Sequence, residues 1–231
     1  MHTLRFNPFG QIHKGLRALL YDTAIMIQQT DFTRQEEIGK VTERVRFVNE
    51  AFAFHADTED HRIFPKIAGI APEVVADFES QHQTDHELSG QLDRCLSLFV
   101  SSNSSEQNAI AGNELLQAFN SFLAFNVEHM KKEETVINAI LWKHFSDADL
   151  LQIVREIAAS VPMDENMKIS AWMLKGMASP EIVAWYKGIQ QTAPAFVFEK
   201  FCQLASRTLA PPRWNKVWES LQASPVTAPM S

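Results

Sequence analysis

Three pairs of potential metal ligands recur along the chain at one spacing, and they constrain its fold more than any other feature. The pairs are His55–Glu59, His82–His86 and His129–Glu133. Residues four apart lie on the same face of an α-helix, one turn from each other. A fold that gathers three such faces around one centre must consist of helices packed side by side, as in a helical bundle.

The apolar residues around these pairs recur at helical spacing. We expect a first helix from Pro8 to just before Asp31, and three more over residues 33–64, 72–100 and 106–145. Pro65 should end the second helix, and the polar run at 101–105 should separate the third from the fourth. No stretch sustains the alternation typical of strands. These features predict an all-α fold, an antiparallel up-down four-helix bundle over residues 1–145 with a carboxy-terminal helical extension.

The extension, residues 146–231, contains shorter helical segments separated by proline. Ser146 and Ser179 are predicted to cap two of them. Helices of about 12 residues are marginal alone, so the extension should pack on the bundle or on a partner, either a second copy or another protein. We find no internal repeat in its sequence, and we expect the last ten residues to be frayed.

Composition narrows the class of protein. The formal charge of -7 and the absence of a basic tract argue against a nucleic-acid partner. No apolar segment approaches the roughly 18 residues of a membrane span, and the amino terminus lacks the apolar run of a signal peptide. The only cysteines, Cys95 and Cys202, do not form a disulfide framework. We therefore expect a cytoplasmic protein that binds neither nucleic acid nor membrane.

His13, in the first predicted helix, adds a seventh donor to the three pairs. Five imidazoles and two carboxylates are too many for one tetrahedral zinc ion, but they suit two near-octahedral ions that share bridges. His61 lies two residues past Glu59 and should point off the ligand face. His144 lies about 20 Å along its helix from His129. One such histidine–glutamate pair could be an ordinary helix-surface pair, but one element on each of four helices is not expected by chance.

This ordered set resembles the hemerythrin-like (HHE cation-binding) family, and the resemblance covers about residues 6–145. It implies that one iron is held by three histidines, the other by two, and that two glutamates bridge them, usually with an oxo or hydroxo group. By this resemblance, the three histidines on one iron would be His82, His86 and His129, and the two on the other would be His13 and His55. The bridging glutamates would be Glu59 and Glu133. The last helix carries HxxxE where the invertebrate oxygen carriers have HxxxxD, a feature of many bacterial HHE proteins. Bulk oxygen transport is therefore not expected.

The resemblance leaves one coordination position open, on the iron held by His13 and His55. We expect it to take a small ligand, O2, NO or peroxide, for sensing, storage or stress response. The alternative is a di-iron redox enzyme, such as a peroxidase, an oxidase or an NO-detoxifying protein, although no catalytic residue is evident. Zinc or manganese could occupy the same donors. Leu16 and Phe125, each one turn from a ligand, are candidates to line the ligand pocket, and ordinary core packing explains them equally well.

Overall fold

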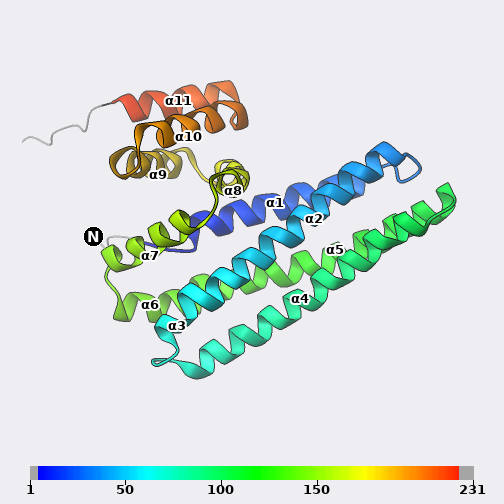
Figure 1. Cartoon of the computed structure of the whole chain (residues 1–231), viewed down its shortest axis with the longest axis horizontal. Coiled ribbons are helices and arrows are strands. Elements are labelled where there is room, and N and C mark those ends of the chain that lie inside the picture. The colour runs from blue at the N-terminus through cyan, green and yellow to red at the C-terminus, as the bar shows by residue number, and fades with distance from the viewer. Residues whose placement is uncertain (1–4, 224–231) are drawn as a thin grey trace, which may run out of the picture.

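The computed structural model describes residues 5–223, and every regular element in that range is helical. Four long helices lie side by side (Figure 1): α1 (Gly10–Gln29), α2 (Gln35–Thr58), α4 (Pro72–Ser101) and α5 (Ser105–Lys132). The α1–α2 and α4–α5 connections lie at the same end of the molecule, so neighbouring helices run in opposite directions. The predicted all-α, antiparallel four-helix bundle is confirmed.

Two of the long helices continue through a π-helical turn. α2 passes through η1 (Glu59–Ile63) into α3 (Phe64–Ile67), and α5 passes through η2 (Glu133–Ile137) into α6 (Asn138–His144). The prediction that Pro65 ends the second helix was wrong by a few residues. Pro65 directly follows the π turn η1, and the helix continues past it to Ile67.

The first helix begins slightly later than predicted, at Gly10 rather than at Pro8. The Asn7 side chain accepts a hydrogen bond from the Phe9 N–H group, 2.9 Å away, just before the helix. Two apolar clusters fill the bundle on either side of His13. One, which includes Leu16 and Phe52, extends toward the α1–α2 and α4–α5 connections. The other, which includes Phe9, gathers around α3 and α6. A polar layer therefore lies between two apolar halves of the core.

The extension consists of five short helices: α7 (Asp147–Ser160), α8 (Met163–Gly176), α9 (Ser179–Thr192), α10 (Ala195–Thr208) and α11 (Pro211–Gln222). Their first residues are 147, 163, 179, 195 and 211, so each helix begins 16 residues after the last. The regularity missed from the sequence is in helix and linker lengths, with a proline at or near the start of α8, α9, α10 and α11. Of the predicted frayed end, only Gln222 and Ala223 are described; the rest lies outside the described residues.

The predicted cap at Ser146 is present, because its hydroxyl accepts a hydrogen bond from the Asp149 N–H group. Ser179 is not a cap. The N-cap of α9 is Ala178, and its N–H group donates to the Glu181 carboxylate, 2.8 Å away. The prediction failed at Ser179 because this residue is already the first residue of α9 and is followed by Pro180.

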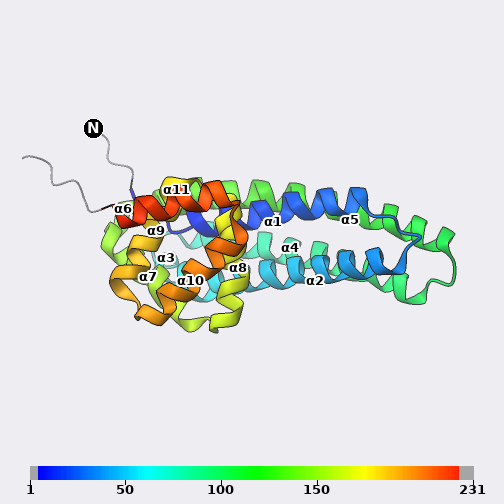
Figure 2. The same ribbon diagram turned by 90° about the horizontal axis from the view of Figure 1, so that it is seen from above.

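The extension contacts the bundle mainly where α8 crosses α1, and Figure 2 shows it over the end that carries α3 and α6. Gly15 and Gly176 allow this crossing. A Cβ atom on Gly15 would lie 2.9 Å from the Met173 backbone nitrogen, and one on Gly176 would lie 2.1 Å from the Lys14 carbonyl oxygen. An ion pair between Lys14 and Glu181 links α1 to α9. The extension thus rests on the residues that flank His13.

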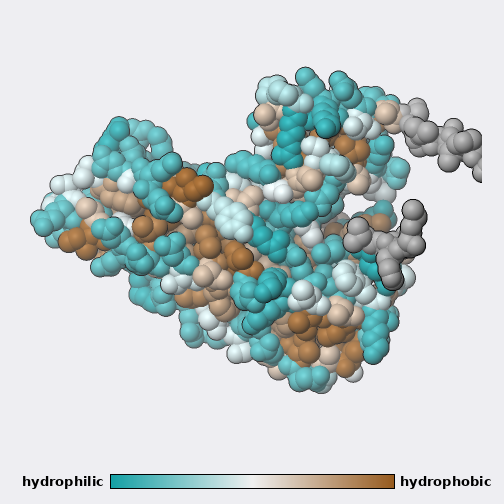
Figure 3. Space-filling model, turned by 180° about the vertical axis from the view of Figure 1, so that it is seen from behind, coloured by the Kyte–Doolittle hydropathy of each residue, from teal (hydrophilic) through white to brown (hydrophobic). Residues whose placement is uncertain are grey.

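The face shown in Figure 3 is mainly polar, with separate apolar patches. Between residues 5 and 223, no helix has both the length and the apolar character needed to cross a membrane. Cys95 and Cys202 are both free and half-buried.

Candidate metal centre

The bundle brings six of the seven predicted ligands together in its interior. Each long helix supplies one histidine, and each π turn supplies one glutamate. None of the six is more than 9 % exposed: His13, His55, His82, His129, Glu59 and Glu133. Buried groups of this kind are rare in a protein core unless they are paired or bind a metal ion.

The six side chains form two donor groups that share both glutamates. One group is His13, His55, Glu59 and Glu133, and the other is Glu59, His82, His129 and Glu133. Within each group one ligand atom per residue lies within 4.8 Å of all the others. Each group therefore offers two imidazole nitrogens and two carboxylate oxygens.

Each glutamate turns one oxygen toward each group. Glu59 Oε1 lies 3.3 Å from His55 Nε2, whereas Glu59 Oε2 lies 3.3 Å from His82 Nε2. Glu133 Oε2 lies 3.4 Å from His13 Nε2, whereas Glu133 Oε1 lies 3.1 Å from His129 Nε2. Donor atoms about 2.1 Å from a common metal ion are about 3.0–3.4 Å from their neighbours in octahedral or tetrahedral geometry. The arrangement suits two ions with two carboxylate bridges.

Both glutamates are the first residue of a π turn, which the sequence analysis did not predict. The Phe64 N–H group donates to the Glu59 carbonyl oxygen, and the Asn138 N–H group donates to that of Glu133. These bonds span five residues instead of four, and π turns of this kind are frequent at functional sites. No simple pattern of residue types predicts them, so the helices were expected to be regular through both positions.

The residue after each glutamate supports a histidine from a different helix. His13 Nδ1 is 2.9 Å from a Glu134 carboxylate oxygen, and His82 Nδ1 is 2.8 Å from an Asp60 carboxylate oxygen. An N–H donated from Nδ1 leaves the Nε2 lone pair free to bind a metal, as is usual for metal-binding histidines. Glu134 is therefore not a freely solvated surface residue. It joins His13 to Arg17, with which it forms an ion pair.

The two donor groups are related by an approximate twofold arrangement, in which α1 and α2 correspond to α4 and α5. The ring centroids of His13 and His55 are 5.0 Å apart, as are those of His82 and His129. His13 stacks on Phe9 with ring centroids 5.2 Å apart, and its counterpart His82 stacks on a phenylalanine of α3 at 5.4 Å. The two metal positions are therefore alike at His13 and His82, whereas His129 also lies against Phe125.

Burial sets the electrostatics of the cluster. Burial and the charge of Glu133 raise the pKa of Glu59 well above its ordinary value. Burial alone would raise the pKa of Glu133 too, but the nearby imidazoles, His129 foremost, outweigh it and lower the pKa to about 2. Burial and the neighbouring His13 hold the pKa of His55 well below its ordinary value. Without a cation, the two glutamates therefore favour sharing one proton.

Five polar atoms at the centre are buried and have no hydrogen-bond partner: both carboxylate oxygens of Glu59, both of Glu133, and His82 Nε2. A buried polar atom left unpaired costs about 1–3 kcal/mol, and more when it is charged. Metal cations between these atoms would satisfy all five. The donor set therefore fits a pair of bound metal ions.

His86 is the one predicted ligand that the bundle does not bring to the centre, which corrects the expectation of five imidazoles. Its side chain is exposed, and it belongs to neither donor group. The inward positions of α4 alternate in steps of four and three, from Phe78 to His82 and then to Asp85. This seam directs Asp85 inward and carries His86 past it. The sequence signal that could have shown this is Asp85 itself, a polar residue at a heptad position that is usually apolar.

The remaining candidates have simple placements. His61 and His144 are exposed and lie outside both groups. Leu16 is fully buried, and Phe125 stacks on His129 with ring centroids 5.9 Å apart.

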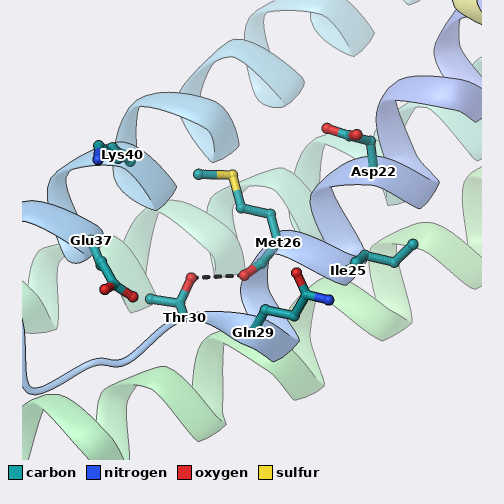
Figure 4. Close-up of a pocket in the computed structure, with 7 residues that line it drawn as sticks. All are labelled: Asp22, Ile25, Met26, Gln29, Thr30, Glu37 and Lys40. Atoms are coloured by element: carbon teal, nitrogen blue, oxygen red, sulfur yellow. Dashed lines mark hydrogen bonds between the residues drawn. The ribbon is translucent and has the colours of Figure 1, made fainter.

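A shallow groove between α1 and α2 lies apart from this centre (Figure 4). It is lined by Asp22, Ile25, Met26, Gln29, Thr30, Glu37 and Lys40. The Thr30 hydroxyl donates to the Met26 carbonyl oxygen, 2.7 Å away. None of the six clustered ligands contributes to the groove, so it is not part of the centre.

Comparisons with known proteins agree with this geometry. The family model described as the hemerythrin HHE cation binding domain matches residues 9–141. Two Arabidopsis thaliana proteins described as zinc finger BRUTUS-like proteins are similar to the chain. One is 19% identical over 173 residues, which cover 75% of this chain and 14% of the relative. The other is 20% identical over 189 residues, which cover 80% of this chain and 15% of the relative. The chain thus spans about one seventh of these relatives, and no solved structure matches it.

Proposed function

Because the chain belongs to the hemerythrin HHE cation-binding family, we propose that it is a non-haem di-iron protein that binds a small ligand, O2, NO or peroxide. The observation that carries this proposal is the division of six buried donors into two groups that share both glutamates. His13 and His55 hold one iron, His82 and His129 hold the other, and Glu59 and Glu133 bridge the two. The biological role that fits is sensing, storage or stress response.

The donor chemistry is compatible with iron. Imidazole nitrogens and carboxylate oxygens suit iron, zinc and manganese, and no thiolate takes part. When bound, the iron pair supplies reversible one-electron chemistry and coordination positions that the protein leaves free. Four protein donors per ion fill four of about six positions. Since His86 does not face inward, free positions remain at both ions, and not only beside His13 and His55 as the sequence analysis expected.

A redox enzyme is the second candidate, and one observation favours it. No catalytic residue was evident from the sequence. The structure places the carboxylate of Asp85 one turn from His82, only 5 % exposed. Burial raises the pKa of this carboxyl. A buried acid beside a metal centre is the kind of group that enzymes use to move protons.

The test is optical and starts from protein loaded with iron and reduced without air. O2 is added in measured amounts while absorption is recorded, and azide is added to the oxidised sample. We expect a new absorption band with each ligand, and recovery of the reduced spectrum on removing O2 if binding is reversible. Repeated consumption of O2 or peroxide with a reductant present supports the enzyme instead. Iron-loaded protein that responds to none of these ligands would overturn the proposal.

A further inference from the structure

One layer of side chains packs against the four ligand histidines on the side opposite Glu59 and Glu133. Glu59 and Glu133 lie one turn beyond their histidines, toward α3 and α6. On the opposite side, three residues from each histidine, the layer consists of Leu16, Phe52, Asp85 and Asn126. Because the carboxylates approach from one side and the imidazoles surround the centre, a ligand bound to metal ions held here would lie toward this layer.

The approximate twofold arrangement is broken in this layer. Leu16 corresponds to Asp85, since each follows its histidine by three residues, and Phe52 corresponds to Asn126. Leu16 and Phe52 are 0 and 2 % exposed, and Asp85 and Asn126 are 5 and 2 % exposed. All four are buried, yet one metal position faces two apolar side chains and the other faces a carboxylate and an amide.

The carboxylate is held in a fixed orientation. Asn126 Nδ2 donates to Asp85 Oδ1, 2.6 Å away, and also to the Phe122 carbonyl oxygen, 3.2 Å away. Both amide hydrogens of Asn126 are therefore used. Within residues 5–223, no side chain or backbone group donates a hydrogen bond to Asp85 Oδ2. Asp85 belongs to neither donor group, so it lies beside the ligands and is not one of them.

We propose that Asp85, positioned by Asn126, forms a polar ligand subsite on the His82–His129 side of the centre. This subsite accepts a hydrogen bond from a small protic ligand, of the class that includes water and hydrogen peroxide. The Leu16–Phe52 side has no such acceptor and suits ligands without a hydrogen to donate. The inference rests on the proposed function, because the ligand must be bound at the metal centre that Asp85 faces.

The experiment compares two small, uncharged nitriles of similar size, cyanamide, which carries N–H hydrogens, and acetonitrile, which has none. Their affinities are measured by optical titration of the oxidised, iron-loaded full chain. Asp85→Asn removes the charged acceptor at nearly constant shape, and Asp85→Leu copies the residue at the corresponding position 16. Asp93→Asn is the matched control. It makes the same change on the same helix, about 12 Å away, at an exposed residue bonded to Asn49.

We expect the ratio of cyanamide to acetonitrile affinity to fall by about tenfold or more in both Asp85 variants, the size expected for one hydrogen bond to a charged acceptor. The Asp93 variant should keep the wild-type ratio, and every variant should keep two ions per chain. An unchanged ratio in iron-loaded Asp85 variants overturns the subsite while leaving the metal centre intact. Wild-type protein that holds no pair of ions overturns the proposed function itself. If Asp85→Asn does not fold, Asp85→Leu decides the result alone.

Discussion

Gly176 is the residue on which the contact between the extension and the metal-binding helix depends most directly. A Cβ atom at this position would lie 2.1 Å from the Lys14 carbonyl oxygen, whereas ordinary contacts begin at 3.4 Å. In Gly176→Ala, α8 and α1 must therefore separate by about 1.3 Å, and the contacts around their crossing are lost. Overpacking of this kind costs about 1–3 kcal/mol. The overlap is with backbone, which cannot rotate away, so the upper part of this range, about 2–3 kcal/mol, applies. The better helix propensity of alanine returns at most about 1 kcal/mol, so we expect a net loss of at least about 1 kcal/mol.

The assay is urea unfolding of the metal-free full chain, followed by far-ultraviolet circular dichroism. Gly188→Ala is the control, because Gly188 is also in the extension and a Cβ atom there would meet nothing within 4 Å. Alanine at position 188 should raise the free energy of unfolding by about 0.5–1 kcal/mol. The two substitutions should thus have opposite signs. Equal stability of the two variants would refute the close approach at Gly176 and, with it, the account of how the extension docks beside His13.

Three further predictions concern the centre. Glu59→Ala or Glu133→Ala should leave fewer than one ion per chain, because each carboxylate serves both ions, whereas His13→Ala should keep at least one; equal losses in metal analysis would contradict bridging. Phe125→Ala or Leu16→Ala should speed oxidation of the reduced protein about tenfold at equal iron loading, through easier water entry, and unchanged rates would place the pocket wall elsewhere. Because its pKa is raised, Glu59 stays protonated in the folded metal-free protein, whereas in the unfolded chain it loses its proton above pH 4.5. The free energy that Glu59 contributes to folding is therefore lost as the pH rises. Glu59→Gln should therefore gain stability relative to wild type from pH 5 to pH 8 without metal, and a constant difference would contradict the raised pKa.

The sequence predicted the bundle and most of the centre because both follow from helical periodicity. A histidine and a glutamate four residues apart share a helix face whatever the rest of the chain does, so His55–Glu59 and His129–Glu133 could be paired in advance. The same rule failed for His82 and His86. The seam of a packed helix advances by three or four residues, and only packing against the other helices decides that Asp85, not His86, turns inward.

Other features depend on packing that residue types do not reveal. The π turns at Glu59 and Glu133 change the backbone bonding of otherwise regular helices, and they accompany the inward placement of Asp60 and Glu134 beside histidines of other helices. The 16-residue spacing of the extension helices is likewise a regularity of helix and linker lengths. Periodicity locates the faces of helices, but contacts between helices select which residues of a face are used.

The central claim is that one chain holds two metal ions between two shared glutamates. Its most direct test is the iron content of the purified full chain, measured per folded protein after loading without air and removal of free metal. We expect two ions per chain, because six buried donors form two groups of four that share Glu59 and Glu133. One ion per chain, or none in a protein that remains folded, would contradict it.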